Sequence, residues 1–189
     1  MRERLLLQAE NIVVSFGEQK VLDFDRFVVY QGERIGLVGA NGAGKTTLLR
    51  VLAGELEPDG GTVKSMCDTH FFRQFSEGID PFELDGKEMK ALQIQDKVWQ
   101  EAVSGGEDTR MRLAWMFSSG KSLVFLDEPT ANLDMEGIAL LKHKLLELDT
   151  MVIVSHDRAL LNAICTRIVE IREGKLSEYE GNYDDYTRL

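Results

Sequence analysis

Gly39-Ala40-Asn41-Gly42-Ala43-Gly44-Lys45-Thr46-Thr47 is the stretch that decides the fold, because its spacing matches the pattern G-x-x-x-x-G-K-[ST]. The run Arg34–Val38 before it predicts a buried strand, and Thr47–Ala53 predicts a helix that ends at Gly54. Between a strand and a helix, such a loop turns successive backbone N–H groups toward phosphate oxygens. The stretch therefore predicts a phosphate-binding loop, and this context argues against an ordinary glycine-rich turn.

Two side chains of the loop suit a nucleoside triphosphate and its metal ion. Lys45 supplies a cation that can reach the β and γ phosphates, and Thr46 supplies a hydroxyl for Mg²⁺. The following helix adds partial positive charge where the phosphates would lie. The residues expected to hold the nucleotide phosphates are Gly39, Asn41, Gly42, Ala43, Gly44, Lys45, Thr46 and Thr47.

Length and charge limit the classes of protein to consider. With 189 residues, the chain is long enough for one α/β domain and too short for two, so we expect a single domain. The formal net charge of −10 disfavours unspecific attraction to nucleic acid or anionic lipid. A local basic patch, for example at Lys142 and Lys144, stays open, although an ordinary solvated helix face is the simpler interpretation.

Cysteine usage and hydropathy indicate a cytoplasmic protein. Cys67 and Cys165 have neither metal-ligand nor redox spacing, so we interpret both as reduced thiols. The run Leu5–Leu7 is too short for the core of a signal peptide, and no apolar run approaches the roughly 20 residues of a membrane span.

Periodicity predicts strands that alternate with helices, which implies a largely parallel sheet covered on both faces. Antiparallel strands are expected to precede the phosphate loop, and a helical insertion is expected over about 75–118, with Pro81 and Gly86 as breakers in its first part. The expected strands are Ile12–Phe16, Phe24–Tyr30, Thr62–Val63, Ser122–Asp127, Met151–Ser155 and a hairpin of Arg167–Arg172 with Leu176–Tyr179. The expected helices are Gly106–Phe117, Met135–Leu148 and Arg158–Cys165.

Two acids follow the apolar run Leu123–Leu126, which places them at the carboxyl end of a buried strand, where ligands bind in such sheets. Asp127 is positioned to bind Mg²⁺ directly or through water, and Glu128 to polarise the water that attacks the γ phosphate. Without the phosphate loop, simple capping of Pro129-Thr130 would be the better interpretation.

The stretch Val103-Ser104-Gly105-Gly106-Glu107 permits two interpretations at once. Ser104 followed three residues later by Glu107 is a capping box that opens a helix. Two glycines at a helix start also expose backbone N–H groups, and Ser104 adds a hydroxyl, which together suit contact with a phosphate.

His156 follows the apolar run Met151–Val154 at the edge of the sheet that also carries Asp127 and Glu128. It can hydrogen-bond a γ-phosphate oxygen there, and this position favours a functional role over that of an ordinary surface histidine. His70 and His143 have no comparable neighbours and receive no role.

These motifs, taken in order, resemble an ABC-type ATPase domain over essentially the whole chain: Gly39–Thr47, Ser104–Glu107, Leu126–Asp134 and Ser155–Asp157. The resemblance implies an α/β P-loop NTPase fold with ATP and Mg²⁺ as ligands. It assigns catalytic roles to Glu128, His156, Gln74 and Lys45, and Mg²⁺ ligation to Thr46, Gln74 and Asp127. It also implies that Phe16 stacks on adenine, although an ordinary strand position is the open alternative. Ser104, Gly105, Gly106 and Glu107 would contact the nucleotide of a second ABC domain, and Asp134 would communicate across the dimer.

Within that superfamily, several features resemble the ABC-F group, whose studied members bind ribosomes. Glu107 stands where transporters commonly have Gln, and Gly174–Tyr186 resembles the stretch that closes the first ATPase domain and leads into an interdomain linker. Leu84–Glu88 and Ser155–Arg158 are similar to the branch that includes antibiotic-resistance ribosome-protection factors. One departure is Val103, where Leu is usual.

The resemblance to ABC-F proteins leaves the number of domains and the partner to be tested. Such proteins carry two ABC domains in one chain, so this chain resembles an N-terminal half that binds ATP but needs a second domain, or a second copy of itself, to hydrolyse it well. The ATP subunit of a membrane transporter, docked on a transmembrane subunit, is one alternative. An ATP-gated interaction module with negligible hydrolysis is another.

Overall fold

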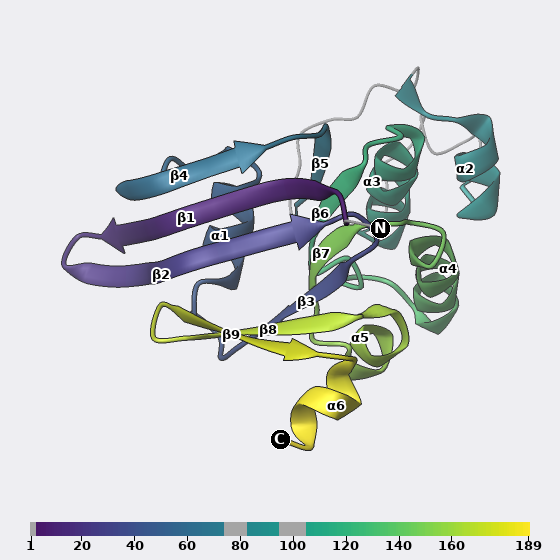
Figure 1. Cartoon of the computed structure of the whole chain (residues 1–189). Coiled ribbons are helices and arrows are strands. Elements are labelled where there is room, and N and C mark those ends of the chain that lie inside the picture. Colours follow the sequence, from purple (N-terminus) through teal and green to yellow (C-terminus); the bar gives the residue numbers. More distant parts are fainter. Residues whose placement is uncertain (1–2, 74–82, 95–104) are drawn as a thin grey trace.

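The computed structural model describes residues 3–73, 83–94 and 105–189, which form two sheets and the helices around them (Figure 1). The larger sheet has six strands in the order β5-β6-β7-β3-β8-β9, of which only the last pair is antiparallel. Its strands are β3 (Arg34–Val38), β5 (Thr69–Phe72), β6 (Leu123–Asp127), β7 (Met151–Val154), β8 (Arg167–Arg172) and β9 (Lys175–Glu180).

The smaller sheet is antiparallel, in the order β2-β1-β4. Strands β1 (Leu5–Phe16) and β2 (Gln19–Tyr30) form a long hairpin that extends beyond the larger sheet, and β4 (Gly60–Ser65) pairs with the other edge of β1 (Figure 1). The hairpin turns over only two residues, and Gly17 there has a φ of 61°, a left-handed conformation that glycine adopts without strain.

Six helices are found among the described residues. They are α1 (Lys45–Leu52), α2 (Gly86–Ala91), α3 (Gly105–Ser118), α4 (Met135–Leu145), α5 (Arg158–Ile164) and α6 (Tyr183–Thr187). Side chains fix several of their starts: Asp134 accepts a hydrogen bond from the Gly137 amide at 2.8 Å, and Asp157 accepts one from the Leu160 amide at 2.9 Å. In the described residues no helix is both long and apolar enough to cross a membrane.

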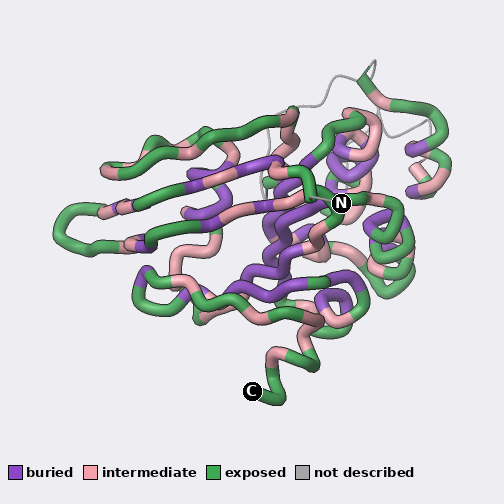
Figure 2. Tube along the Cα trace, viewed as in Figure 1, coloured by how far each residue is buried: buried purple, intermediate pink, exposed green. Residues whose placement is uncertain are grey.

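Alternate residues of the central strands supply two separate cores, one on each face of the larger sheet. Leu123 and Phe125 of β6 face a core that includes α1 and the antiparallel sheet. Val124 and Leu126 face a core that includes α3, α4 and α5. Strands β6 and β7 are accordingly buried along their whole length (Figure 2), as parallel strands covered on both faces must be.

The predicted fold class is confirmed, whereas several predicted boundaries are wrong. The second strand starts at Gln19 rather than Phe24, because the tight hairpin returns at once along β1 and pairs Gln19 with Phe16. Gly86 does not break the insertion; it is the first residue of α2, whose N-cap is Asp85. Two short elements were not expected: β5, which extends the parallel sheet beside β6, and α6, which begins with a capping box between Asn182 and Asp185.

Lys144 does not lie on a solvated helix face, contrary to the prediction. Its exposed fraction is 5%, and its Nζ lies 2.8 Å from Glu88 Oε2 and 2.6 Å from Glu147 Oε2. Burial lowers the pKa of Lys144, but the carboxylates of Glu147 and Glu88 outweigh it and hold that pKa above its ordinary value. The ammonium group therefore ties α4 to α2 as a buried ion pair.

Candidate active site

Three neighbouring strands bring three of the four predicted catalytic side chains, those of Lys45, Glu128 and His156, to one edge of the larger sheet. The phosphate loop follows β3, Glu128 follows β6, and His156 follows β7 by two residues. Because β7 lies between β6 and β3, His156 lies between the acids and the phosphate loop. Parallel strands end at the same edge, so residues that are far apart in the sequence meet there.

The phosphate loop depends on glycine at two positions. Gly44 has a φ of 103° and acts as the N-cap of α1, and a Cβ on it would lie 2.9 Å from Val21 Cγ1. Gly39 has a φ of 151°, and a Cβ there would lie 2.6 Å from the Ile171 carbonyl oxygen. Lys45 donates from Nζ to the carbonyls of Gly39 at 2.7 Å and Ala40 at 3.1 Å, so its ammonium group lies across the loop. The loop thus presents a cation and the free N–H groups of a helix start to one region.

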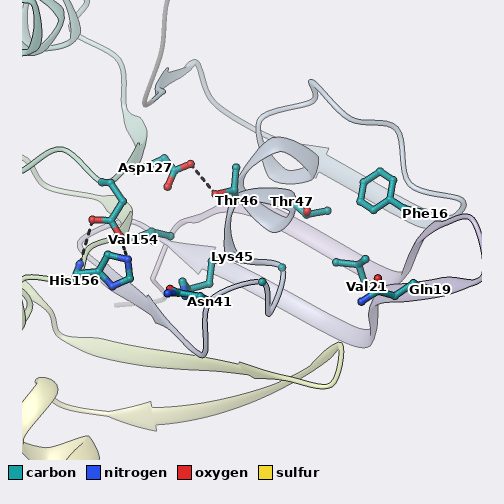
Figure 3. Close-up of a pocket in the computed structure, with 13 residues that line it drawn as sticks. Phe16, Gln19, Val21, Asn41, Lys45, Thr46, Thr47, Asp127, Val154 and His156 are labelled. Carbon is teal, nitrogen blue, oxygen red and sulfur yellow. Dashed lines mark hydrogen bonds and ion pairs between the residues drawn. The ribbon is translucent and has the colours of Figure 1, made fainter. Parts of the chain in front are cut away.

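Thr46 and Asp127 form the pair expected to hold a metal ion. The Thr46 hydroxyl donates to Asp127 Oδ2 at 2.9 Å (Figure 3). Burial raises the pKa of the Asp127 carboxyl, and the Thr46 hydrogen bond opposes this increase. A hydroxyl and a carboxylate are hard oxygen ligands, and Mg²⁺ is commonly held by one or two such groups while it keeps several waters. The donor set fits Mg²⁺.

Glu128 and His156 contact each other twice. His156 Nε2 lies 3.1 Å from Glu128 Oε1, and the His156 backbone amide donates to Oε2 at 3.2 Å. Apart from the His156 ring, Oε1 has no hydrogen-bond partner among the described residues. Burial raises the pKa of Glu128, and the contacts with His156 oppose that shift. A buried carboxylate with a raised pKa is a better proton acceptor than an exposed one, which suits a general base.

The phosphate loop, the acids and His156 line one cavity of about 380 Å³ (Figure 3). Phe16, at the end of β1, lines the same cavity on the side of Thr47 and is 52% exposed, so one face of its ring is open to a flat ligand. This position is compatible with stacking on a base and also with an ordinary strand position, because single exposed apolar side chains are common on protein surfaces.

Gln19 and Val21 also line the cavity, and the sequence interpretation missed both. Both belong to β2, and Gln19 pairs directly with Phe16 across the hairpin. Neither residue was expected near the site, because the strand was predicted to start at Phe24 rather than at Gln19. The available signal was the two-residue turn after Phe16, which places Gln19 opposite the aromatic ring.

The described members of the predicted partner-facing group, Gly105, Gly106 and Glu107, lie at the start of α3. Gly105 and Gly106 form its first turn, and a Cβ on Gly106 would lie 2.9 Å from the Asn132 carbonyl oxygen. Glu107 follows in the same turn. Asp134 caps α4 and its Oδ1 also lies 3.3 Å from Arg110 NH2, so it has a structural role whatever else it does. Gln74 and Ser104 lie outside the described residues.

Comparisons with known proteins agree with this geometry. A family model described as "ABC transporter" matches residues 22–101. The chain is 33% identical, over 96% of its length, to the energy-dependent translational throttle protein EttA of Haemophilus influenzae. It is 36% identical, over 97% of its length, to the erythromycin resistance ATP-binding protein MsrA of Staphylococcus epidermidis. The chain spans only 37% and 38% of the length of these two relatives.

Solved structures show the same fold. The RNase-L Inhibitor superposes on the whole chain with a TM-score of 0.84 and 24% identity, and the chain covers 42% of it. An ATP-binding subunit of an ABC transporter superposes on 97% of the chain with a TM-score of 0.81 and 21% identity, and the chain covers 92% of it. The sequence matches and this fold together show that the chain belongs to the ABC-type ATPases and is most like their ABC-F group.

Proposed function

We propose that the chain is an ATP-binding and ATP-hydrolysing domain of an ABC-F protein that acts on the ribosome. The observation that carries ATP chemistry is that Lys45, Thr46, Asp127, Glu128 and His156 line the same cavity. The ribosome is suggested by the names of two relatives, one a translational throttle protein and the other an erythromycin resistance protein. An antibiotic-resistance role belongs to the same proposal, and it depends on the second relative alone.

The side chains divide the chemistry between charge neutralisation and activation of water. Lys45 and the amides of the phosphate loop neutralise the negative charge of the phosphates. Glu128 accepts the proton of the attacking water or orients that water toward the γ phosphate. His156, 3.1 Å from Glu128, is placed to donate to a γ-phosphate oxygen and to hold the carboxylate in position. The products are ADP and phosphate.

Thr46 and Asp127 would hold Mg²⁺, and Gln74 is proposed as its third protein ligand from the family pattern. When bound, the ion would supply neutralisation of the negative charge of the phosphates. Within the described residues, the Thr46 hydroxyl and the Asp127 carboxylate lie 2.9 Å apart, so both oxygens are close enough to hold one ion between them.

A second ABC domain would complete the site. Ser104, Gly105, Gly106 and Glu107 would contact the nucleotide held by that domain, and Asp134 would relay the state of one site to the other. We treat residues 1–189 as one nucleotide-binding domain, with the C-terminal stretch as the start of a linker. The partner domain is either part of the same protein or a second copy of this chain.

Co-sedimentation with ribosomes tests this function. Purified protein carrying Glu128→Gln is layered with 70S ribosomes on a sucrose cushion with Mg-ATP, with Mg-ADP or without nucleotide. We expect this variant in the ribosomal pellet with Mg-ATP, but not with Mg-ADP or without nucleotide, because slow hydrolysis should prolong the ATP-bound state. Glu10→Gln, at an exposed position of the central strand β1, is the matched control and should be released as the native protein is.

Other outcomes would favour a different function for the protein. An ATP-dependent dimer that never sediments with ribosomes would favour a transporter subunit. Native protein that binds ATP but releases no phosphate, even as a dimer, would favour an interaction module gated by nucleotide. The first outcome would refute the ribosomal role and the second would refute hydrolysis, while the nucleotide site would stand in both cases.

A further inference from the structure

We propose that Arg112 is a positioning residue that joins the end of β5 to helix α3, so that nucleotide bound at the phosphate loop changes the partner-facing start of α3. The proposal rests on the proposed function, in which Gly105–Glu107 serve the nucleotide of a second domain. Arg112 lies two turns into α3 and is only 6% exposed, although it carries a full charge. Such a residue is retained only where its donors are satisfied.

Every side of the Arg112 guanidinium has a partner. Its Nε donates to Asp108 Oδ2 at 2.9 Å, NH1 donates to the Arg73 carbonyl, and NH2 lies 3.4 Å from Thr109 Oγ1. Its flat face covers the ring of Phe72 at 4.8 Å from the ring centroid. One guanidinium therefore holds two successive residues at the end of β5, Phe72 by its face and Arg73 by its edge.

Thr109 extends this contact to the loop that follows the catalytic acids. The residue is 1% exposed, and its hydroxyl lies 3.0 Å from the Gly105 carbonyl and 3.3 Å from the Ala131 carbonyl. Gly105 is the first residue of α3, and Ala131 lies three residues after Glu128. The Arg112–Thr109 pair thus joins the end of β5, the start of α3 and the loop after β6.

Arg73 connects this junction, formed by the end of β5, the start of α3 and the loop after β6, to α1, the helix that follows the phosphate loop. Its side chain pairs with Glu55, which follows α1 at the turn through Gly54, while its carbonyl accepts the hydrogen bond from Arg112. Arg73 is also the residue before Gln74 in the sequence. A continuous series of polar contacts therefore runs from the end of α1, through Arg73, Arg112 and Thr109, to the first turn of α3.

The chemistry of this junction depends on a planar group with several fixed donors. Lysine keeps the charge but has a single donor centre, so it cannot bond the Arg73 carbonyl and Thr109 while covering the Phe72 ring. Methionine keeps the length and the packing but has no donor. A Thr109→Val change removes the hydroxyl at nearly constant shape, and Thr109→Ser restores it. These variants separate the polar connection from packing.

Hydrogen exchange of α3 amides, measured with the full chain, tests the inference. In the native chain we expect Mg-ATP to slow exchange across residues 105–113 by at least about threefold, because ligand binding stabilises the elements coupled to its site. In Arg112→Met, Arg112→Lys and Thr109→Val the ATP dissociation constant should stay within about twofold of the native value while this protection disappears. Thr109→Ser should retain the protection. Arg26→Met, at an exposed position of β2, is the arginine control and should respond as the native chain does.

Three results would overturn the proposal. If saturating Mg-ATP leaves the exchange rates of the α3 amides of the native chain unchanged, nucleotide binding is not coupled to this helix, although the nucleotide site would stand. Protection that persists in Arg112→Met, or in Thr109→Val if Arg112→Met does not fold, would exclude this junction as its carrier. Equal loss of protection in Thr109→Val and Thr109→Ser would point to packing rather than the hydroxyl. Failure of the native chain to bind Mg-ATP at all would instead refute the proposed function.

Discussion

His156 contacts Glu128 through both its ring and its backbone: Nε2 lies 3.1 Å from Oε1, and the amide donates to Oε2 at 3.2 Å. The carboxylate is thereby fixed between the end of β6 and the end of β7. Glu128 also has a φ of 51°, a left-handed conformation that non-glycine residues seldom adopt. Such strain, held by two contacts from one histidine, is typical of a side chain positioned for chemistry.

Replacing Glu128 by glutamine should remove hydrolysis and preserve binding. The amide cannot accept a proton, so we expect phosphate release to fall by about 10²- to 10⁴-fold, the usual contribution of a general base. ATP affinity, measured with a fluorescent analogue, should stay within about threefold of the native value because the phosphates are held elsewhere. Hydrolysis at the native rate in Glu128→Gln would remove Glu128 from the mechanism.

The pH dependence of hydrolysis should show an acid limb that belongs to Glu128. Burial raises the pKa of this carboxyl above its ordinary value of 4.5. The ionised form is the base, so activity should fall as the pH decreases through the raised pKa, which lies above 4.5. Residual hydrolysis by Glu128→Gln should lack this limb. A native profile that stays flat down to pH 4.5 would contradict the assignment.

Asp127→Asn should stabilise the fold while it weakens Mg²⁺-dependent binding. The carboxylate is 4% exposed and its pKa is raised by burial, so above this raised pKa the charged form destabilises the folded state. Asparagine can still accept from Thr46 without that charge. In EDTA at pH 7 we expect a Tm about 2–4 °C higher, equivalent to about 1 kcal/mol at this chain length.

The same variant has a definite pH signature. Stability of the native chain should decrease as pH rises through the interval between the ordinary pKa of 3.8 and the raised folded value, because the folded state binds the proton more tightly there. The advantage of Asp127→Asn should therefore vanish below that interval, where both states carry the proton. A Tm difference that is independent of pH would show that charge burial is not its cause.

Gly44→Ala should abolish nucleotide binding, whereas Gly120→Ala should affect stability alone. Alanine at Gly44 would face a φ of 103° and a Cβ contact of 2.9 Å with Val21, so the loop must shift. Gly120 has a φ of 62° with nothing within 4 Å of an added Cβ, which limits the cost to about 1–2 kcal/mol. Calorimetric titration with Mg-ATP and thermal melts separate the two, and equal ATP affinity in both variants would contradict the prediction.

The buried pair of Lys144 and Glu88 should behave as a coupled unit. Lys144→Met leaves the buried carboxylate of Glu88 uncompensated and should lower the free energy of unfolding by about 2–4 kcal/mol. Glu88→Leu should lower it by less, because Glu147 still pairs with Lys144. The double variant Glu88→Leu/Lys144→Met should recover much of that loss. Urea unfolding of the native chain and all three variants measures it, and strictly additive losses would show that the two residues do not interact.

The phosphate loop, the acids and His156 were predictable because each lies in an uninterrupted local pattern: an apolar strand followed by polar residues with a fixed spacing. Parallel strands end at a common edge, so local patterns were enough to predict that Lys45, Asp127 and His156 share a cavity. The roles of Gln74 and Ser104, which lie outside the described residues, stay predictions.

Tertiary structure decided what depends on contacts between distant segments. Nothing local marks Lys144 as buried, since its carboxylate partner Glu88 lies 56 positions away on α2, and an isolated helix would leave it in water. Gln19 reaches the cavity only because the hairpin turns at once after Phe16. Arg112 joins α3 to the end of β5 through its hydrogen bond to the carbonyl of Arg73, the residue after that strand. The sequence by itself determined which chemistry the chain carries, because the residues that perform it lie in short motifs. Packing determined which charges are buried and which loops are joined, because burial is a property of the whole fold.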